Sequence, residues 1–320
     1  MSRRFIKQLG DNETIDEVFL VSEKQLRTNR NGNLFLQMRL ADRSGSVTAM
    51  MWNANDRLYG SFDNGDFLHV YGATQFYSGS LQMIVNRIEP AIVEKINESD
   101  FVTLGSDEIE KMAARVSELL RGIRNDHLKN LAECFLMDDA LMTNYAAAPA
   151  GIKHHHAYRG GLLDHVVSLM EVVAVVAPRY PDLDPDLLMM GAFLHDLGKV
   201  EELTYDRELG YSDAGQMLGH VVIATGLLDT KIRETVELSG EEFPEALRLQ
   251  LQHMILSHHG TYEFGSPKLP MTLEALTLHL LDTLDSQLHA FAQIMRDDSN
   301  TDSNWTPYQA ALGRKLYKRE

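Results

Sequence analysis

The stretch Gly191–Lys199, GAFLHDLGK, places a histidine beside an aspartate late in a strongly apolar segment. That segment opens with Asp184-Pro185, a helix cap followed by proline at the first helical position, so it predicts a helix. Neighbouring residues on a helix project about 100° apart, and His195 and Asp196 therefore cannot both point deep into a core. Both can face a cleft, where pairing or metal binding offsets the cost of burying a charged aspartate.

Further histidines and one aspartate have similar apolar surroundings elsewhere in the chain. They are His165 after Gly160-Gly161-Leu162-Leu163-Asp164, His220 after Gly219, His258-His259 before Gly260, and Asp282 at the end of Leu278-His279-Leu280-Leu281. Imidazoles and carboxylates together suit Mn²⁺, Fe²⁺, Zn²⁺ or Ni²⁺, and one carboxylate can bridge two ions. Two ions about 3.5–4 Å apart can activate water and stabilise a phosphoryl displacement. The ordered set therefore predicts a divalent-metal site.

The other histidines are interpreted as ordinary core or surface residues, because a lone histidine in an apolar helix is usually partly buried without being a ligand. The residues concerned are His253, His279 and His289 in helices, and His69 and His127 at the surface. Three histidines in a row at 154–156 are weak evidence for ligation.

Most of the chain from Ser106 onward has a helical period. The first such segment carries apolar residues at Ile109, Met112, Val116, Leu119 and Leu120, a stripe typical of an amphipathic helix. Breaks at 149–151, 178–185 and 265–270 contain proline or glycine and divide the remainder into further helices.

The first ninety residues have short β-prone runs between turn signals. The runs are Val18–Val21, Leu34–Leu40, Val47–Trp52, Phe67–Phe76 and Leu81–Ile88. Leu36, Met38 and Leu40 alternate with Gln37 and Arg39, as in a sheet with one face in water. Five strands in this length favour a small closed barrel of the OB type. The predicted fold is α+β multidomain, with a five-stranded OB-type β-barrel at 1–92, a linker at 93–105 and an all-α domain at 106–320.

The net charge of −16 is unevenly distributed along the chain. Residues 1–92 carry ten basic and ten acidic residues, whereas residues 93–320 carry twenty basic and thirty-six acidic residues. A neutral barrel does not exclude nucleic acid. The single cysteine, Cys134, indicates a reducing compartment. We expect a cytoplasmic protein without membrane association, since no signal peptide is apparent and the apolar run Val166–Ala177 is too short to span a bilayer.

The motifs GGLLDH at 160–165 and LHDLGK at 194–199, together with Asp282, resemble those of the HD superfamily of metal phosphohydrolases. The resemblance implies an HD-type helical domain in which His165, His195, Asp196 and Asp282 surround one ion. His220, His258 and His259 look like the additional ligands of its two-metal branch, in which the HD aspartate bridges the ions.

Within that superfamily the chain resembles the YhaM-type 3′→5′ exoribonucleases, which carry an OB domain before the HD domain. The stretches that carry this resemblance are Gly198–Leu203, Gly219-His220, Leu256–Gly260 and Gly265–Pro267. It implies a two-metal phosphodiesterase that hydrolyses single-stranded RNA to nucleoside 5′-monophosphates. Mn²⁺ is the implied ion, with Fe²⁺, Co²⁺, Ni²⁺, Zn²⁺ and Mg²⁺ as alternatives. The cyclic-di-GMP phosphodiesterase branch is disfavoured, because Gly260–Gly265, GTYEFG, lacks its Gly-Tyr-Pro signature.

Asp196 and Lys199 are the predicted catalytic residues. Lys199 lies one helical turn beyond His195, where its ammonium can face the scissile phosphate; the alternative is a lysine that complements the helix dipole. The phosphate role is favoured because Gly198 is expected to end the helix at the cleft.

Aromatic and basic side chains in two regions are candidates for RNA contacts. The predicted contacts are Tyr205, Arg207 and Tyr211 in the loop 203–211, and Phe35, Arg39, Trp52, Phe76 and Tyr77 in the barrel. Aromatic platforms with basic residues are how OB domains hold single strands. Half or more of the barrel aromatics belong to the core, since strands alternate faces.

Three other functions fit the same sequence: a nucleotide phosphohydrolase with an accessory OB module, a cyclic-dinucleotide phosphodiesterase, and a non-catalytic OB binding protein. Single-stranded DNA stays open beside RNA, because no feature reports on the 2′-hydroxyl. Homo-oligomerisation is also open, with Leu227–Leu238 and Trp305–Tyr317 as candidate surfaces.

Overall fold

A computed structural model describes residues 3–77, 80–92, 96–101, 104–152, 158–205, 209–298 and 303–318. The chain divides into two compact units, one of Met1–Thr103 with Phe291–Glu320 and one of Leu104–Ala290. The division after Thr103 falls inside the linker predicted at 93–105. Residues 291–320, which the sequence placed in the helical domain, group with the first unit instead.

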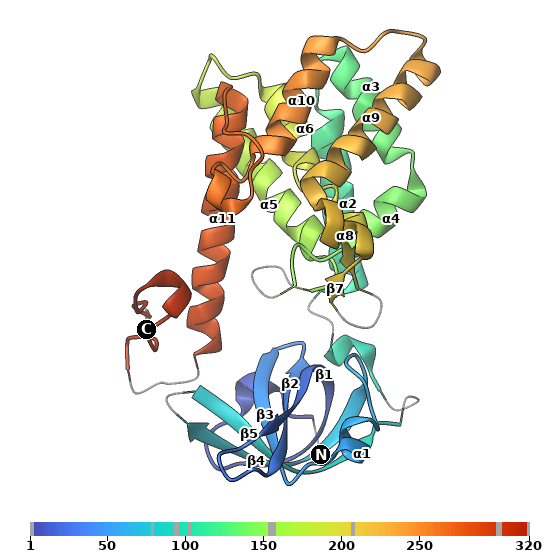
Figure 1. Cartoon of the computed structure of the whole chain (residues 1–320). Coiled ribbons are helices and arrows are strands. Elements are labelled where there is room, and N and C mark those ends of the chain that lie inside the picture. The colour runs from blue at the N-terminus through green and yellow to red at the C-terminus, as the bar shows by residue number, and fades with distance from the viewer. Residues whose placement is uncertain are drawn as a thin grey trace. The chain divides into compact units, whose positions relative to one another are not determined.

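The first unit contains a closed five-stranded barrel (Figure 1). Its strands are β1 (Thr14–Thr28), β2 (Leu34–Asp42), β3 (Gly45–Trp52), β4 (Phe67–Tyr77) and β5 (Ser80–Pro90), with the short α1 (Asp56–Tyr59) after β3. The strand order is β1-β2-β3-β5-β4, and only the β3–β5 pair is parallel among the described strand pairs of the barrel. The OB-type barrel predicted from the sequence is confirmed.

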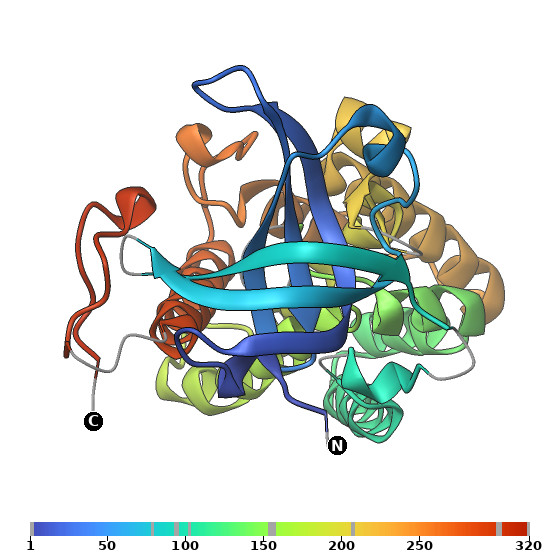
Figure 2. The ribbon, with the colours of Figure 1, turned by 90° about the horizontal axis from the view of Figure 1, so that it is seen from below.

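Alternation along β2 shows why these residues form a barrel. Leu36, Met38 and Leu40 are at most 1% exposed, whereas Gln37 and Arg39 face outward. Strand β1 closes the barrel because it pairs with β4 through its first half and with β2 through its second. Its register shifts near Glu23, which has a positive φ of 53° and lets the strand bend. Figure 2 shows β4 and β5 running across the blue strands.

The second unit is helical. Its elements are α2 (Ser106–Arg121), α3 (Asp126–Leu136), α4 (Asp139–Ala147), α5 (Gly161–Val176), α6 (Pro185–Leu194), α7 (Lys199–Glu202), α8 (Asp213–Leu218), α9 (His220–Ser239), α10 (Glu245–Ser257) and the first part of α11 (Leu273–Asp297), with a two-stranded hairpin of β6 (Leu203–Thr204) and β7 (Gly210–Tyr211). The residues of α11 from Phe291 on group with the first unit. Helix α6 starts as predicted, because the Asp184 side chain accepts hydrogen bonds from the amides of Asp186 and Leu187. All ten α6 residues except Pro185 and Asp186 are buried.

One described helix, Gly161–Arg179, is long and apolar enough by length and composition to cross a membrane. It is longer than the apolar run Val166–Ala177, which was judged from the sequence to be too short. Its best window has a mean hydropathy of 1.6, and 50% of that window is buried inside the unit. Leu162, Val166 and Val173 of this helix are fully buried in the helical core. A core helix passes the same test, so the hydropathy is weak evidence for a membrane.

The apolar segment Leu227–Leu238, considered above for self-association, lies in α9. Leu228 and Ile232 are buried in the core, whereas Leu238 is 70% exposed. Most of its apolar character is therefore used within the unit.

Candidate metal centre

The His195-Asp196 pair lies in a turn, because α6 ends at Leu194 and α7 begins at Lys199. The prediction that Gly198 ends the helix is therefore wrong. A Cβ at Gly198 would lie 2.0 Å from the backbone oxygen of His220, so glycine is needed where the start of α9 approaches the turn. This approach brings His220 close to the pair.

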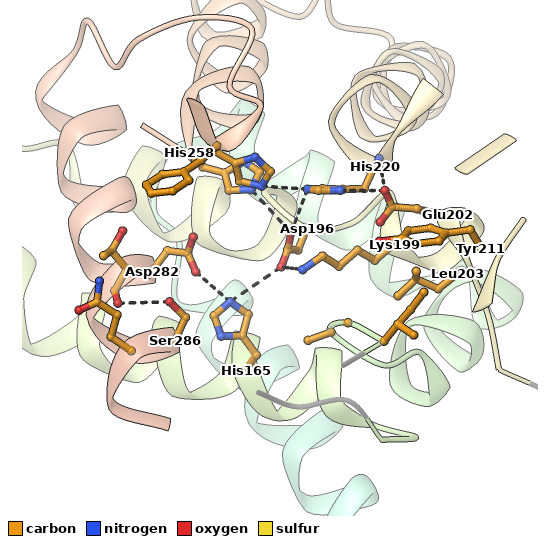
Figure 3. A pocket seen from close by; sticks show the side chains of 17 residues that line it. His165, Asp196, Lys199, Glu202, Leu203, Tyr211, His220, His258, Asp282 and Ser286 are labelled. Atoms are coloured by element: carbon orange, nitrogen blue, oxygen red, sulfur yellow. Dashed lines mark hydrogen bonds and ion pairs between the residues drawn. The ribbon is translucent and has the colours of Figure 1, made fainter. Parts of the chain in front are cut away.

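A first cluster, of His165, His195 and Asp282, joins α5, the turn and α11. Figure 3 shows its members His165 and Asp282. The Nε2 atoms of His165 and His195 are 3.2 Å apart, and His165 Nε2 lies 3.2 Å from Asp282 Oδ1. Asp282 Oδ1 also lies 4.0 Å from His195 Nε2. Three ligand atoms from distant parts of the sequence thus lie within 4.8 Å of one another, close enough to hold one ion.

A second cluster consists of His220, His258 and His259. His220 is the first residue of α9, and His258 follows the last residue of α10. The Nε2 atoms of His220 and His259 are 3.2 Å apart, and the ring centroids of His258 and His259 are 4.2 Å apart. This cluster holds three imidazoles without a carboxylate of its own.

Asp196 lies between the clusters and presents one oxygen to each (Figure 3). Its Oδ2 is 3.4 Å from His195 Nε2 and 3.9 Å from His165 Nε2. Its Oδ1 is 3.5 Å from His220 Nε2 and 3.7 Å from His258 Nε2. Oδ1 is buried and accepts no hydrogen bond from any described residue. A buried carboxylate oxygen without a donor is expected where a cation binds.

Four of these imidazoles are oriented through Nδ1, which leaves Nε2 directed at the centre. His195 and His258 donate to the carbonyls of Ala192 and Ile255 at 2.8 and 2.7 Å. His165 Nδ1 lies 2.8 Å from Asp285 Oδ2, and His220 Nδ1 lies 3.1 Å from Glu202 Oε1. Such partners fix the tautomer and ring orientation of metal-binding histidines.

Asp285 and Glu202 were not among the site residues predicted from the sequence. Asp285 had a usable signal, since it follows Asp282 by three residues on the same face of a helix. Glu202 had none, because its partner His220 lies 18 residues away along the chain.

His279, interpreted from the sequence as a core histidine, supports the second cluster from outside. Its Nδ1 donates to the His258 carbonyl at 2.8 Å. Its ring fills the space beside Gly260, where a Cβ would lie 2.1 Å from the imidazole. Gly260 also has a φ of +78°, which glycine adopts readily. His279 thereby fixes the turn that carries His258 and His259.

Electrostatics at the centre favour positive charge in the first cluster. Burial is the largest influence on His165 and opposes its charge, but hydrogen bonds to Asp282 and Asp285 raise the pKa of His165 to about 10. Burial pushes the pKa of Asp282 upward, yet its interactions with His165 and His195 hold that pKa well below its ordinary value. In the second cluster, burial holds the pKa of His258 well below its ordinary value, and His195 and His259 act in the same direction.

The centre opens into a cavity of about 1120 Å³. Lys199 lines it, with Nζ 2.6 Å from Asp196 Oδ2. Tyr211 and Phe264 also line it and are 51% and 72% exposed; Phe264 was not singled out from the sequence. Tyr205 is not among the described lining residues, and its hydroxyl donates to the Asn144 carbonyl at 3.3 Å. Arg207 lies outside the described residues.

The predicted barrel contacts differ in exposure. Phe35 is 9% exposed and packs against Trp52, its partner in the β2–β3 register, with ring centroids 5.2 Å apart. Trp52, Phe76 and Tyr77 are 46%, 39% and 62% exposed. Arg39 is exposed and donates from Nε to Ser46 Oγ at 2.8 Å. Three rings and one guanidinium of the predicted set are thus open to solvent.

Two family models match the chain: an OB-fold nucleic acid binding domain at residues 20–91 and an HD domain at residues 162–287. The HD match includes all seven predicted metal ligands.

The chain is also similar over most of its length to proteins named 3′-5′ exoribonuclease YhaM. One from Listeria monocytogenes serotype 4b (strain CLIP80459) is 31% identical over 285 residues, which cover 89% of this chain and 88% of that protein. One from Bacillus subtilis (strain 168) is 33% identical, over 87% of this chain and 86% of that protein. One from Bacillus velezensis is 34% identical, over 86% of each.

Proposed function

The chain belongs to the YhaM family of 3′-5′ exoribonucleases, and we propose that it removes nucleotides from the 3′ end of single-stranded RNA as nucleoside 5′-monophosphates. The observation that carries this proposal is the position of Asp196, whose two oxygens face two separate histidine clusters. That arrangement suits a metal-dependent phosphodiesterase better than a binding protein, because binding alone needs no shared buried carboxylate.

The donor set fits two divalent ions. His165, His195, Asp196 and Asp282 would hold the first ion, and His220, His258, His259 and Asp196 would hold the second. The buried Asp196 Oδ1 without a hydrogen-bond donor among the described residues supports the bridging role. The imidazole-rich set favours Mn²⁺, Fe²⁺, Co²⁺, Ni²⁺ or Zn²⁺ over Mg²⁺, which prefers oxygen ligands. When bound, such ions activate water and stabilise charge on phosphoryl oxygens. Among them we favour Mn²⁺.

Lys199 has two connected roles in the proposal. Its ammonium ion pairs with Asp196 at 2.6 Å, which fixes the carboxylate. It also lines the cavity, so it attracts the scissile phosphate and offsets charge that develops there. Glu202, Asp285 and His279 act on the reaction through the imidazoles that they orient.

Each unit offers side chains of its own for contacts with RNA. Tyr211 stacks on the terminal base in this proposal, while Tyr205 and Arg207 remain predicted contacts of the same loop. On the barrel, Trp52, Phe76 and Tyr77 offer stacking platforms, Arg39 offers a phosphate contact and Phe35 supports Trp52. The cavity of about 1120 Å³ is ample for a mononucleotide.

The proposal also includes the cellular location and the domain bounds. A cytoplasmic location suits an RNA-degrading enzyme whose one cysteine, Cys134, is free and buried. The barrel domain would end near residue 92, with 93–105 as the linker.

The test is a time course on single-stranded RNA labelled at the 3′ or the 5′ end, with Mn²⁺ and with chelator. We expect metal-dependent release of mononucleotide from the 3′ label and a shrinking ladder from the 5′ label. A DNA strand of the same sequence, free nucleotides and a cyclic dinucleotide run in parallel. Intact RNA beside hydrolysis of either small substrate would contradict the exoribonuclease assignment.

A further inference from the structure

Residues 303–318 form a small hairpin beyond the parts of the chain that the two family models match. Its arms are joined at Trp305–Tyr317 and Gln309–Arg314, and a short 3-10 turn (Ala310–Leu312) closes the tip. The Thr306 amide donates to the Leu316 carbonyl at 2.9 Å, and the Lys318 amide donates to the Asn304 carbonyl at 2.7 Å. We call this element the 303–318 hairpin.

Side-chain alternation gives the hairpin a buried face and an exposed face. Thr306 and Leu316 are 1% and 4% exposed, so Trp305 and Tyr317 lie on the opposite side. These two rings form a cross-strand pair with centroids 5.2 Å apart, yet each remains about half exposed, at 51% and 53%. Tyr308 is also exposed, at 61%, but it lies nearer the tip, with its hydroxyl beside Gly313. Large rings exposed together indicate a binding surface.

The charge of the hairpin is opposite to that of the chain. Residues 303–318 contain Arg314, Lys315 and Lys318 and no acidic residue, within a chain of net charge −16. Lys318 is ion-paired with Asp298 at 2.8 Å, and the Arg314 guanidinium lies over the Phe291 ring, 5.6 Å from its centroid, whereas Lys315 is exposed. Lys315 precedes Tyr317 by two residues, so alternation places its side chain on the same face as the aromatic pair.

We infer that the exposed face of the 303–318 hairpin is a second single-stranded RNA site that holds substrate outside the catalytic cavity. The inference rests on the proposed exoribonuclease function. Stacking rings beside cations are what a single strand requires of a protein surface. The hairpin also groups with the barrel, the unit whose family model is a nucleic acid binding domain.

A second copy of the chain is the less suitable occupant. A symmetric contact through the middle of this face would bring the Lys315 side chains of the two copies toward each other. Phosphates complement those charges, whereas a matching surface repels them.

The test compares a 24-nucleotide RNA with a tetranucleotide, using the Mn²⁺-loaded full chain. The variants are Trp305→Ala/Tyr317→Ala and Lys315→Ala, with Tyr180→Ala as the control for an exposed aromatic residue, 59% exposed, in the helical unit. For the double variant we expect KM for the long RNA to rise at least about fivefold with kcat unchanged, and the tetranucleotide to be cleaved normally. For Lys315→Ala, the salt dependence of long-RNA binding should fall by about 0.7 in log–log slope.

Trp305→Phe/Tyr317→Phe keeps the stacking faces and should retain tight binding, which separates stacking from hairpin folding. Equal behaviour of variants and wild type on both lengths overturns the inference, as does an equal loss on both. A change in molar mass by light scattering would instead identify a self-association surface. Fluorescence anisotropy with the long RNA runs in parallel, so that failure of the wild type to shorten RNA refutes the proposed function separately.

Discussion

The two histidine clusters contact opposite oxygens of one aspartate, but they differ in charge and in how firmly their side chains are held. The first contains Asp282, and Asp285 supports its His165 from behind. The second contains only imidazoles, and His259 Nδ1 is buried without a hydrogen-bond partner among the described residues. Because carboxylate charge is a main determinant of cation affinity, we expect the first cluster to hold its ion more tightly.

The largest effect should come from Asp196→Asn, which weakens the link to both clusters at once. We expect RNA hydrolysis to fall by about a thousandfold, since each ion contributes several kcal/mol of charge stabilisation. Single-turnover kinetics measure the loss of hydrolysis, and mass spectrometry measures the loss of bound metal. Full metal content with normal hydrolysis would refute the shared-carboxylate arrangement.

Removing one ligand should remove the ion of one cluster and leave the ion of the other. His259→Ala is expected to retain one ion and Asp282→Asn to lose the tighter one, each with hydrolysis reduced about a hundredfold or more. In a chelator titration the wild type should release ions in two steps, and His259→Ala should lack the weaker step. His253→Ala is the control, because the His253 ring accepts a hydrogen bond from the Met271 amide and belongs to neither cluster. A single release step in the wild type would show that the clusters do not differ.

Removing the carboxylates that orient the histidines should have smaller effects, and each removal should again affect mainly one of the two ions. Asp285→Asn should weaken the first ion by about 10–100-fold, and Glu202→Gln should weaken the second by a similar factor. The exposed neighbour Glu201→Gln should change neither, which makes it a matched control. Equal weakening of both ions by Asp285→Asn would contradict the assignment.

The affinity of the two clusters for their ions should also depend differently on pH, with a small effect for each fraction of a pH unit. The pKa of His165 is raised to about 10, so at neutral pH a proton occupies the first cluster and a metal ion must displace it. Affinity for the first ion should therefore rise about tenfold for each pH unit up to that pKa. The pKa values of His258 and His259 are lowered, so the second ion should depend little on pH above neutrality. Calorimetry in buffers of different ionisation enthalpy would count the released protons.

The barrel could be predicted from the sequence, and the proposed metal ligands could be picked out there, because both depend on local patterns. Alternation at Leu36–Leu40 and the apolar surroundings of His165 and His195 are visible without a structure. The roles of Glu202 and Phe264 were missed because they depend on which loops meet in space. The grouping of residues 291–320 with the first unit was missed for the same reason.

Gly198 was misjudged because its importance is steric: it allows a backbone from elsewhere in the chain to come close. In a mutational scan scored on RNA turnover, position 198 should be as intolerant as the ligand positions, although its residue offers no donor atom. Every replacement adds at least a methyl group where the His220 carbonyl already lies. Each missense change at this codon should therefore behave like the loss of a ligand histidine, and a Gly198→Ala allele should be rescued only by a compensating shift in the start of α9.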